Sequence, residues 1–282
     1  MIKFGPSGNS LSFYESGGKS TVEAMKWVAD MGLTAYEYSC GKGINVGQDT
    51  AMKIGQEARK HGITVSVHAP YYTNLANPFT DKRENTNMYV INSLKVARLM
   101  GGSRVVFHPG AYMKREPRQC MDIALEQMKL LMRQIDDEGL GDMTVCPETM
   151  GKLGQLGTVD EVLELCSVDE RIIPCIDFGH IYARSLGTVD SYEAFDAILA
   201  VIADRLGEQR MKSMHIHFSR IEYTKGGEKQ HHTFSSEWGP HFEFLARALA
   251  ERGAHPTVIC ESDGTMAEDA SEMQKIYLSY AK

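Results

Sequence analysis

The sequence has no pair of cysteines at CxxC spacing and no other metal-finger arrangement, although it contains six cysteines. Cys146, Cys175 and Cys260 fall in apolar runs, where a thiol is usually a small core group. No apolar run approaches the ~20 residues of a membrane span, and the opening MIKFGPSG is too short for a signal peptide. We therefore expect a cytoplasmic protein with free thiols and no membrane partner.

The sequence also lacks an excess of positive charge, because 30 Lys and Arg stand against 37 Asp and Glu, a net charge of −7. A strong overall attraction to nucleic acid or anionic membranes is therefore not expected, although a local basic rim or bound cations can replace it. No Gly-rich phosphate loop and no Ser–His–Asp order is present. No motif of those two kinds competes for the chemistry.

Strand-like and helix-like patterns alternate along the whole chain, and strand beginnings recur roughly every 30 to 40 residues, as βα units require. The predicted strands are Ile2–Gly5, Ala35–Ser39, Thr64–His68, Arg104–His108, Met143–Glu148, Ile172–Asp177, Ser213–Phe218 and Thr257–Glu261. Eight βα units in a row predict a closed (β/α)8 TIM barrel of the α/β class. With no linker or low-complexity segment, residues 1–282 are expected to form a single domain. An open doubly wound sheet is the alternative.

The helical segments carry recognisable end signals. Thr158 and Glu161 have the spacing of a capping box, which predicts a helix start. Glycines stand where four predicted helices end, as C-terminal glycines do: Gly32, Gly62, Gly101 and Gly207.

Six successive predicted strands end in a residue that can ligate a metal, and only the first two strands lack one. These residues are His68, His108, Glu148, Asp177, His215 and Glu261, and His180 follows Asp177 by three residues. In a TIM barrel the C-terminal strand ends form the active-site face. Each residue alone could be a hydrogen-bonded loop residue, a helix cap or an ion-pair partner. Together they predict a metal site, and mixed His and carboxylate ligation suits zinc or manganese.

At these residues the chain resembles the endonuclease IV family, metal-dependent apurinic/apyrimidinic endonucleases with a xylose-isomerase-like barrel. The resemblance extends over nearly the whole chain. It rests on HAPYYTNLANP at 68–78, VVFHPG at 105–110, PETMGKLGQLGT at 147–158, CIDFGH at 175–180, MHIH at 214–217, the HH pair at 231–232 and CES at 260–262. It implies cleavage of DNA 5′ to abasic sites by a trinuclear zinc centre, with DNA as the partner, and we expect a monomer.

The resemblance also implies roles for the strand-end residues. His68 and His108 would hold one metal, and Glu148 would bridge it to a second. Asp177, His215 and Glu261 would complete the second metal, and His180 with His231 would hold the third. The implied cofactor is two or three Zn2+ per chain, with Mn2+ possible, and the implied catalytic residues are Glu148 and Glu261.

The loop after His68 offers substrate contacts. Tyr71 and Tyr72 could stack on bases or wedge into an opened duplex, or they could simply pack over the barrel mouth. Asn74 follows in the same loop, where we expect it to fix the loop and count it with the substrate-binding residues.

The chain departs from the family pattern at the third metal. The family has an Asp two residues before the third-site His, whereas this chain has Lys229 before His231. The Lys229 ammonium could take the place of the carboxylate and contact a phosphate oxygen. Glu228 could instead become the replacement ligand, which requires a local bend that Gly226 and Gly227 make possible. We expect three metals, with Glu228 or water completing the third site.

Two other functions remain open. A metal-dependent sugar isomerase or epimerase on the same barrel would need only Glu148, Asp177, His215 and Glu261 around one metal, with His180 near a sugar hydroxyl. The surplus histidines His68, His108 and His231 favour the phosphodiesterase. A non-catalytic metal-bearing barrel that binds nucleic acid or a sugar phosphate is supported by Lys229 alone.

Overall fold

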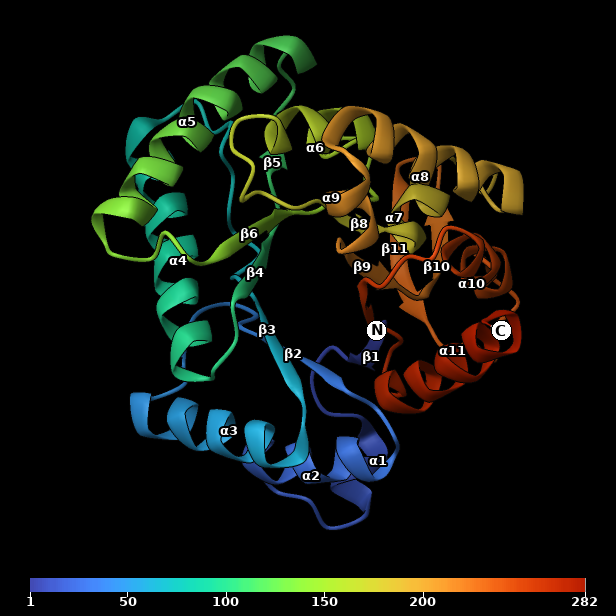
Figure 1. Cartoon of the computed structure of the whole chain (residues 1–282). Helices are drawn as coiled ribbons and strands as arrows, with labels where there is room; N and C mark the ends of the chain where they lie inside the picture. Colours follow the sequence, from blue (N-terminus) through green and yellow to red (C-terminus); the bar gives the residue numbers. More distant parts are fainter. Residues whose placement is uncertain (282) are drawn as a thin grey trace.

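The chain closes into a barrel of eight parallel strands, which the computed structural model describes over residues 1–281 (Figure 1). The barrel strands are β1 (Lys3–Pro6), β2 (Ala35–Ser39), β3 (Thr64–His68), β4 (Arg104–Phe107), β6 (Thr144–Pro147), β8 (Cys175–Asp177), β9 (His215–Phe218) and β12 (Thr257–Cys260). They pair in two parallel runs, β1-β12-β9-β8 and β2-β3-β4-β6. Parallel bridges between Ser7 and Glu37, and between Val145 and Ile172, join the runs on both sides. The TIM barrel prediction is confirmed, and the open sheet is excluded.

Helices surround the strands on the outside (Figure 1). They are α1 (Leu11–Glu15), α2 (Thr21–Asp30), α3 (Gln48–His61), α4 (Thr80–Leu99), α5 (Pro117–Asp137), α6 (Val159–Cys166), α7 (Phe178–Arg184), α8 (Tyr192–Leu206), α9 (Glu208–Lys212), α10 (Phe242–Glu251) and α11 (Met266–Tyr280). The capping box of Thr158 and Glu161 opens α6, and Gly62, in the left-handed conformation at φ 71°, ends α3.

Strand alternation divides the buried side chains into an outer apolar layer and a polar barrel interior. On β9, Ile216 and Phe218 belong to the main apolar core, whose residues also come from the helices. The intervening His215 and His217 are fully buried and lie close to Glu37 from β2. The barrel interior is therefore built to hold polar groups, which positions them beneath the mouth.

Two short pairings at the mouth were not predicted from the sequence. β5 (Gly110–Ala111) pairs with β7 (Gln155–Leu156), and β10 (Arg220–Thr224) forms an antiparallel hairpin with β11 (Gly227–His232). The hairpin follows β9 directly, so it lies at the end of the barrel where the strands finish.

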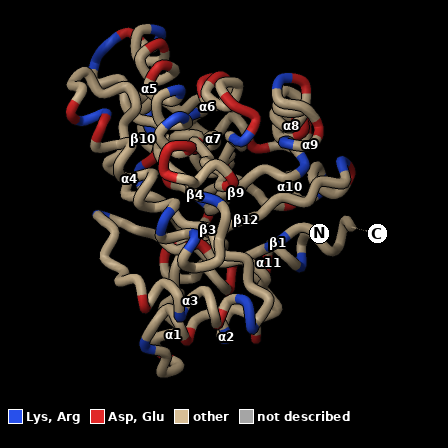
Figure 2. The backbone as a smooth tube through the Cα atoms, turned by 60° about the vertical axis from the view of Figure 1, so that its left-hand side comes forward, with Lys and Arg blue, Asp and Glu red and all other residues tan. Residues whose placement is uncertain are grey.

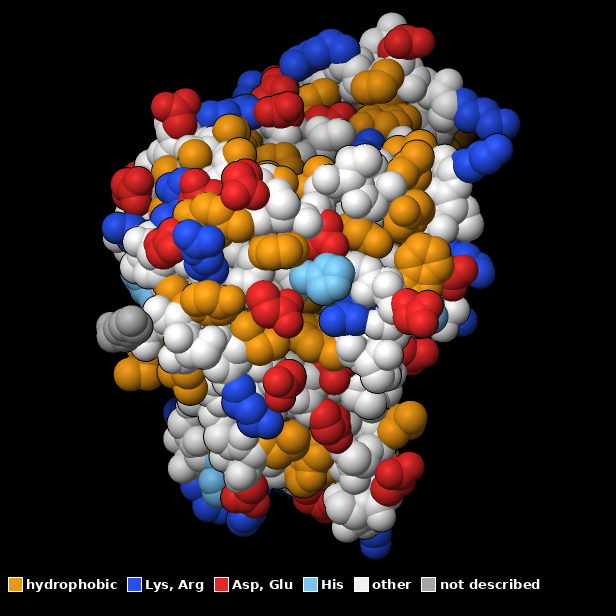
Figure 3. Space-filling view, turned by 90° about the vertical axis from the view of Figure 1, so that its right-hand side faces the viewer, with side chains coloured by type: hydrophobic (Ala, Val, Ile, Leu, Met, Phe, Trp, Pro, Cys, Tyr) orange, Lys and Arg blue, Asp and Glu red, His pale blue; other side chains and the backbone are white. Residues whose placement is uncertain are grey.

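The surface carries both signs of charge. Lys and Arg are interspersed with Asp and Glu along the backbone (Figure 2), and basic, acidic and apolar side chains also mix on the face seen in Figure 3. None of the helices within residues 1–281 has the length and apolar character needed to cross a membrane.

Candidate metal centre

Glu148 lies at the centre of the predicted site, immediately after β6. Its Oε2 is 3.1 Å from Nε2 of His68 and 3.3 Å from Nε2 of His108. Its Oε1 is 2.9 Å from Nδ1 of His217 and 3.5 Å from Nδ1 of His180. The two oxygens of one buried carboxylate thus face different sets of histidines, which is the arrangement of a carboxylate that joins two neighbouring metal positions.

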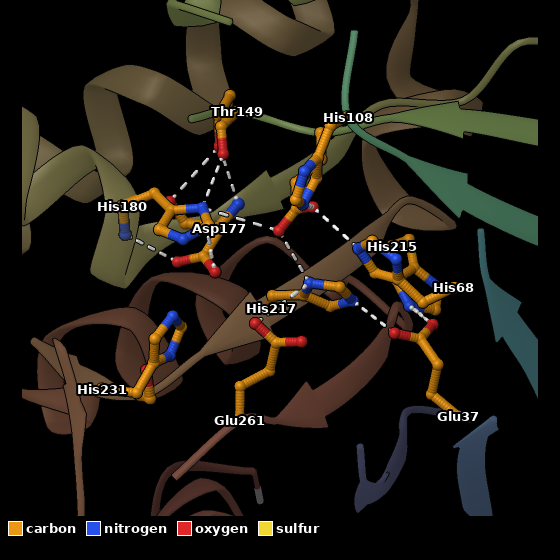
Figure 4. Close-up of polar contacts among 12 residues, drawn as sticks. Glu37, His68, His108, Thr149, Asp177, His180, His215, His217, His231 and Glu261 are labelled. Carbon is orange, nitrogen blue, oxygen red and sulfur yellow. Dashed lines mark hydrogen bonds and ion pairs between the residues drawn. The ribbon is translucent and has the colours of Figure 1, made fainter. Parts of the chain in front are cut away.

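A second set of donors surrounds the other oxygen of Glu148. Glu148, Asp177, His217 and Glu261 offer ligand atoms that all lie within 4.8 Å of one another, and the labelled members converge in Figure 4. Asp177 is fully buried, and its Oδ2 has no hydrogen-bond partner, whereas its Oδ1 accepts from the His180 backbone N–H at 2.7 Å. A buried carboxylate oxygen without a partner is costly. A divalent cation among these donors would satisfy it, so the residues present fit a metal.

The ring orientations of two histidines also suit metal ligation. His68 Nδ1 is 2.7 Å from the Ala69 carbonyl oxygen, and His180 Nδ1 is 2.8 Å from the Thr149 carbonyl oxygen. A carbonyl only accepts, so each Nδ1 carries the proton and each Nε2 is left as the ligand atom. Metal-binding histidines are usually oriented in this way through their second nitrogen.

His217, rather than the expected His215, completes the second set. His215 is fully buried deeper in the barrel, where its Nε2 lies 3.0 Å from Oε2 of Glu37. His217 reaches Glu148 with Nδ1 and lies 2.9 Å from Oε1 of Glu37 with Nε2. Both point inward because they are two residues apart on β9, but only the later one is at the level of the mouth. The prediction for His215 is corrected accordingly.

Glu37 is a site residue that the sequence reasoning missed. It is fully buried, and Ser66 donates a hydrogen bond to its Oε2 at 2.8 Å. Burial raises the pKa of Glu37, but the charges of His217 and His215 outweigh it and hold the pKa well below its usual range. The signal was present in AYEYS, where an acid stands in the middle of an apolar strand.

A deeper group of possible donors consists of Cys175, His215 and His217. Burial raises the pKa of the Cys175 thiol well above its usual value. Metal ligation requires the thiolate, so this group is a poorer metal site than the carboxylate-bearing groups above it.

The third set of donors consists of His180, Glu228 and His231, again within 4.8 Å of one another. Glu228 Oε2 is 3.4 Å from His180 Nε2, and its Oε1 is 3.9 Å from His231 Nε2. Lys229 turns the other way, and its Nζ lies 2.6 Å from Oε1 of Glu222. Of the two alternatives for this position, the structure therefore has Glu228 facing the site. Because Lys229 points away from the site, it is not one of the substrate contacts, contrary to expectation. The non-catalytic barrel, which depended on Lys229 alone, therefore loses its support.

An irregularity in the hairpin explains the exchange. Tyr223 pairs with Glu228, and the next residue of β10, Glu222, pairs with Gln230, so Lys229 is an extra residue on β11. In a regular strand, residues three apart point to opposite faces. The bulge adds one residue, and Glu228 therefore faces the same side as the histidine that follows Gln230.

The hairpin is anchored beside the strand-end loop that contains Gly151. The Glu228 backbone N–H donates to the Gly151 carbonyl oxygen at 3.1 Å. Gly227 has φ 91°, and a Cβ at this position would lie 2.2 Å from the same carbonyl. Only glycine permits this close approach, which sets the position of Glu228 relative to His180.

Burial and mutual charge shift the pKa values of the donors. Burial raises the pKa of Glu148, but His217 and the other histidines outweigh it, and the pKa lies well below its usual range. Burial also raises the pKa of Asp177, with the nearby His180 opposing the shift. Burial lowers the pKa of His68, yet hydrogen bonding and charge from Glu148 raise it to about 9. Without a metal, protonated histidine compensates the carboxylates; a divalent cation would replace that positive charge.

Six of the donors line a mouth cavity of about 230 Å³, which also includes Tyr71 and Lys152; they are His68, His108, His180, Glu228, His231 and Glu261. Tyr71 and Tyr72 are 45% and 58% exposed, so neither is packed away beneath the loop. Asn74 does not line the cavity. Its Oδ1 accepts from the backbone N–H groups of Ala76 and Ala111, at 3.0 and 3.3 Å. Asn74 therefore fixes the loop, as expected, and is not positioned as a substrate-binding residue.

A larger cavity of about 490 Å³ adjoins the mouth cavity, because both include His231 and Glu261. Its other residues come mainly from the loops after β1 and β12, including Ser7, Asn9 and Ser262. The metal centre therefore lies at the junction of two cavities and is accessible to a ligand larger than either one alone.

Comparison with known families and proteins agrees with this architecture. The family described as xylose isomerase-like TIM barrel matches residues 25–277. An uncharacterized protein of Methanocaldococcus jannaschii is 35% identical over 277 residues, which are 98% of this chain and 97% of that protein. A probable endonuclease 4 of Aster yellows witches'-broom phytoplasma is 27% identical over 210 residues, which are 72% of this chain and 68% of that protein.

Two solved structures illustrate the breadth of the fold. A D-tagatose 3-epimerase-like protein superposes with a TM-score of 0.70 at 20% identity, over 99% of this chain and 98% of that chain. Endonuclease IV from Thermus thermophilus superposes with a TM-score of 0.68 at 18% identity, over the same shares of the two chains. At this level of identity the likeness shows the fold alone.

Proposed function

The chain belongs to the xylose isomerase-like TIM barrel family, and from this premise we propose that it is a metal-dependent phosphodiester hydrolase that cleaves DNA at abasic sites. The observation that carries the proposal is the third set of donors, His180, Glu228 and His231. A barrel that needs one metal has no use for it. In this chain Lys229 stands where the family has an Asp, and a bulge brings Glu228 to face the two histidines instead. The retention of a carboxylate at this place supports the use of the third position.

The residues would divide among three cations. His68, His108 and Glu148 would hold the first, Glu148 with Asp177, His217 and Glu261 the second, and the hairpin set the third. When bound, such cations supply Lewis-acid polarisation of a phosphodiester and lower the pKa of water. The relatives named probable endonuclease 4 support this reading.

The protein side chains have their own tasks in this mechanism. Glu148 would serve two of these positions through its two oxygens, and the buried Asp177 would direct its unpartnered Oδ2 at the centre. Tyr71 and Tyr72, exposed on the rim, offer ring faces to an unstacked base. Lys152, which lines the mouth cavity, offers a positive charge to a phosphate.

The test is cleavage of a duplex that carries one abasic analogue, before and after treatment with a chelator. We expect cleavage by the metal-loaded protein, loss after chelation, and recovery on adding zinc or manganese. Glu148→Gln keeps the side-chain shape but removes the charge that two cations share, so it should lose at least one metal and at least ~100-fold in rate.

Lys229→Ala is the matched control, because its side chain points away from the centre to Glu222. It should retain metal content and most of the rate. A Glu148→Gln protein with normal metal content and normal cleavage would contradict the bridging role.

The alternative is a sugar epimerase that uses only the second set of donors. Glu148, Asp177, His217 and Glu261 offer ligand atoms within 4.8 Å of one another and would suffice for one metal. Elemental analysis of the purified protein separates the two, since one tightly bound metal per chain favours the epimerase and three favour the hydrolase. Interconversion of ketoses without cleavage of abasic DNA would decide for the epimerase.

A further inference from the structure

The opposite end of the barrel, where the strands begin, contains an unassigned cavity of about 270 Å³, here named the floor pocket. Two cations enter it from strand beginnings, Lys3 from β1 and Arg104 from β4, and His255 lies beside them. Hydroxyl groups complete much of its wall: Thr64, Ser66, Ser103, Ser213 and Thr257. Met1 and Val65 complete the lining, which includes no Asp or Glu, so all the formal charge that its side chains offer is positive.

The two cations are not neutralised by the protein. Elsewhere Arg171 pairs with Asp136 and Asp169, and Arg252 lies 2.6 Å from Asp196. Within residues 1–281, neither Lys3 nor Arg104 has a carboxylate at ion-pair distance, and the guanidinium of Arg104 reaches only the Met214 carbonyl oxygen, at a long 3.5 Å. The donors of both side chains remain available to a ligand.

Holding these cations together has an electrostatic cost. Burial lowers the pKa of Lys3, and the charge of Arg104 lowers it further. Two positive groups that line one pocket disfavour each other's charged form unless an anion lies between them. An anionic ligand would offset the repulsion and restore the ordinary preference of Lys3 for its charged form.

We propose that the floor pocket binds a phosphate group, either as inorganic phosphate or as part of a small phosphate monoester. The Arg104 fork can bind two phosphate oxygens, and Lys3 supplies a point charge. Thr64, Ser103 and Thr257 can add hydroxyl donors. The hydroxyls of Ser66 and Ser213 already donate to Glu37 and to the Gln209 carbonyl oxygen. The volume lies just below the range of pockets for drug-sized ligands, so it suits a phosphate with a small organic part.

The floor pocket is separate from the metal centre. The buried Glu37 and His215 occupy the barrel interior between the two ends. Ser66 is the residue that links the floor pocket to this interior. Its side chain lines the floor pocket, and its hydroxyl donates to Glu37, whose Oε1 lies 2.9 Å from His217. The proposal stands whether or not the hydrolase function is correct.

Calorimetric titration of the metal-loaded protein with inorganic phosphate, and separately with ribose 5-phosphate, tests the proposal. We compare the wild type with a Lys3→Gln/Arg104→Gln double variant and with Lys212→Gln. Lys212 is close in sequence to the wall residue Ser213 but does not line the pocket, and it lies 3.5 Å from Glu208. Metal content and circular dichroism verify that each variant is folded and retains its mouth site.

The double variant should weaken one binding event roughly 10- to 100-fold, the loss expected when hydrogen bonds to a charged group are removed, while Lys212→Gln binds like wild type. The stronger of the two titrants identifies the form that binds. Wild-type crystals soaked in selenate and measured at the selenium edge give an answer that does not depend on variants. A peak between Lys3 and Arg104 supports the proposal; selenate at the metal centre alone, or identical phosphate binding in the double variant, overturns it.

Discussion

His217 lies between two carboxylates that have different tasks. Its Nδ1 faces Glu148 at the centre, and its Nε2 lies 2.9 Å from Oε1 of Glu37 beneath the centre. With a cation bound between Nδ1 and Glu148, the ring would carry its proton on Nε2, where the charge of Glu37 would favour that form. Glu37 is thus a positioning residue that touches no metal position itself.

Glu37→Gln tests this role. The amide keeps the shape but weakens the hold on the His217 tautomer, so we expect metal affinity to fall ~10- to 100-fold. Competition with a chromophoric chelator measures that affinity. Glu57→Gln, an equal change on the outer helix α3 at a side chain 32% exposed, is the control and should bind metal like wild type. Unchanged affinity in Glu37→Gln would show that Glu37 serves packing only.

At this scale the sequence predicts which residue types gather, but not their depth. His68, His108, Glu148, Asp177 and Glu261 could be assigned because each ends a strand, and strand ends meet at one rim. His215 and His217 could not be separated, because residues two apart point to the same face. Their depth depends on how the strands are staggered around the barrel, which is a property of the closed sheet.

The hairpin β10–β11 is the element that sets the third donor group. Its one extra residue, Lys229, carries no ligand, yet it turns Glu228 toward His180. A bulge re-aims side chains in this way at many functional sites. The position of the extra residue, rather than its side chain, is what matters here.

Deletion of Lys229 tests the hairpin directly. Without the extra residue Glu228 stands two positions before His231, and residues two apart in a regular strand face the same side, so Glu228 should still face His231. We expect this variant to keep every metal by elemental analysis and to retain cleavage of abasic DNA, whereas Glu228→Gln should lose one metal per chain. Lys229→Ala keeps the bulge and should also keep every metal. A deletion variant that loses one metal would show that the site needs the bulge itself and not only the side that Glu228 faces.

Sequence reasoning could not decide this element, because a bulge has a weak signature. Gly226 and Gly227 make a bend possible, and on that ground the sequence offers Glu228 as a replacement ligand. The deciding contacts are the Glu228 N–H on the Gly151 carbonyl and the ion pair of Lys229 with Glu222. Gly151 lies on the loop after a different strand, so nothing local to the hairpin sequence predicts it.

For the whole molecule, closure of the barrel is what makes one site out of distant segments. The pairing of β1 with β12 joins the beginning and end of the chain, and it brings Glu261 to the rim that His68 and Glu148 also reach. Eight βα units were readable from the sequence because strand and helix periodicities alternate with few interruptions. The net charge of −7 is also a property of the whole chain. A protein of this charge needs bound cations to attract a polyanion to its mouth.

Metal removal should therefore lower the stability of the whole barrel without unfolding it. Each site held at about 1,000 times its Kd stabilises the folded state by ~4 kcal/mol, so loss of one metal should lower Tm by on the order of 10 °C for a chain of this size, and chelation of all the metals should lower it further. The loss is limited because protonated histidine can replace part of the positive charge, as the His68 pKa of about 9 beside Glu148 indicates, and the apolar core between strands and helices is unchanged.

Thermal unfolding followed by circular dichroism, with chelator and with chelator pre-saturated with zinc as the control, measures the effect. Restoring zinc should restore Tm, and Glu228→Gln should show a smaller change on chelation than wild type because it has one metal fewer to lose. Equal Tm with and without chelator, in a protein shown by elemental analysis to have lost its metals, would mean that the histidines and carboxylates satisfy one another fully. The cluster would then be a structural ion-pair network, and the unpartnered Oδ2 of Asp177 would have to be satisfied by water.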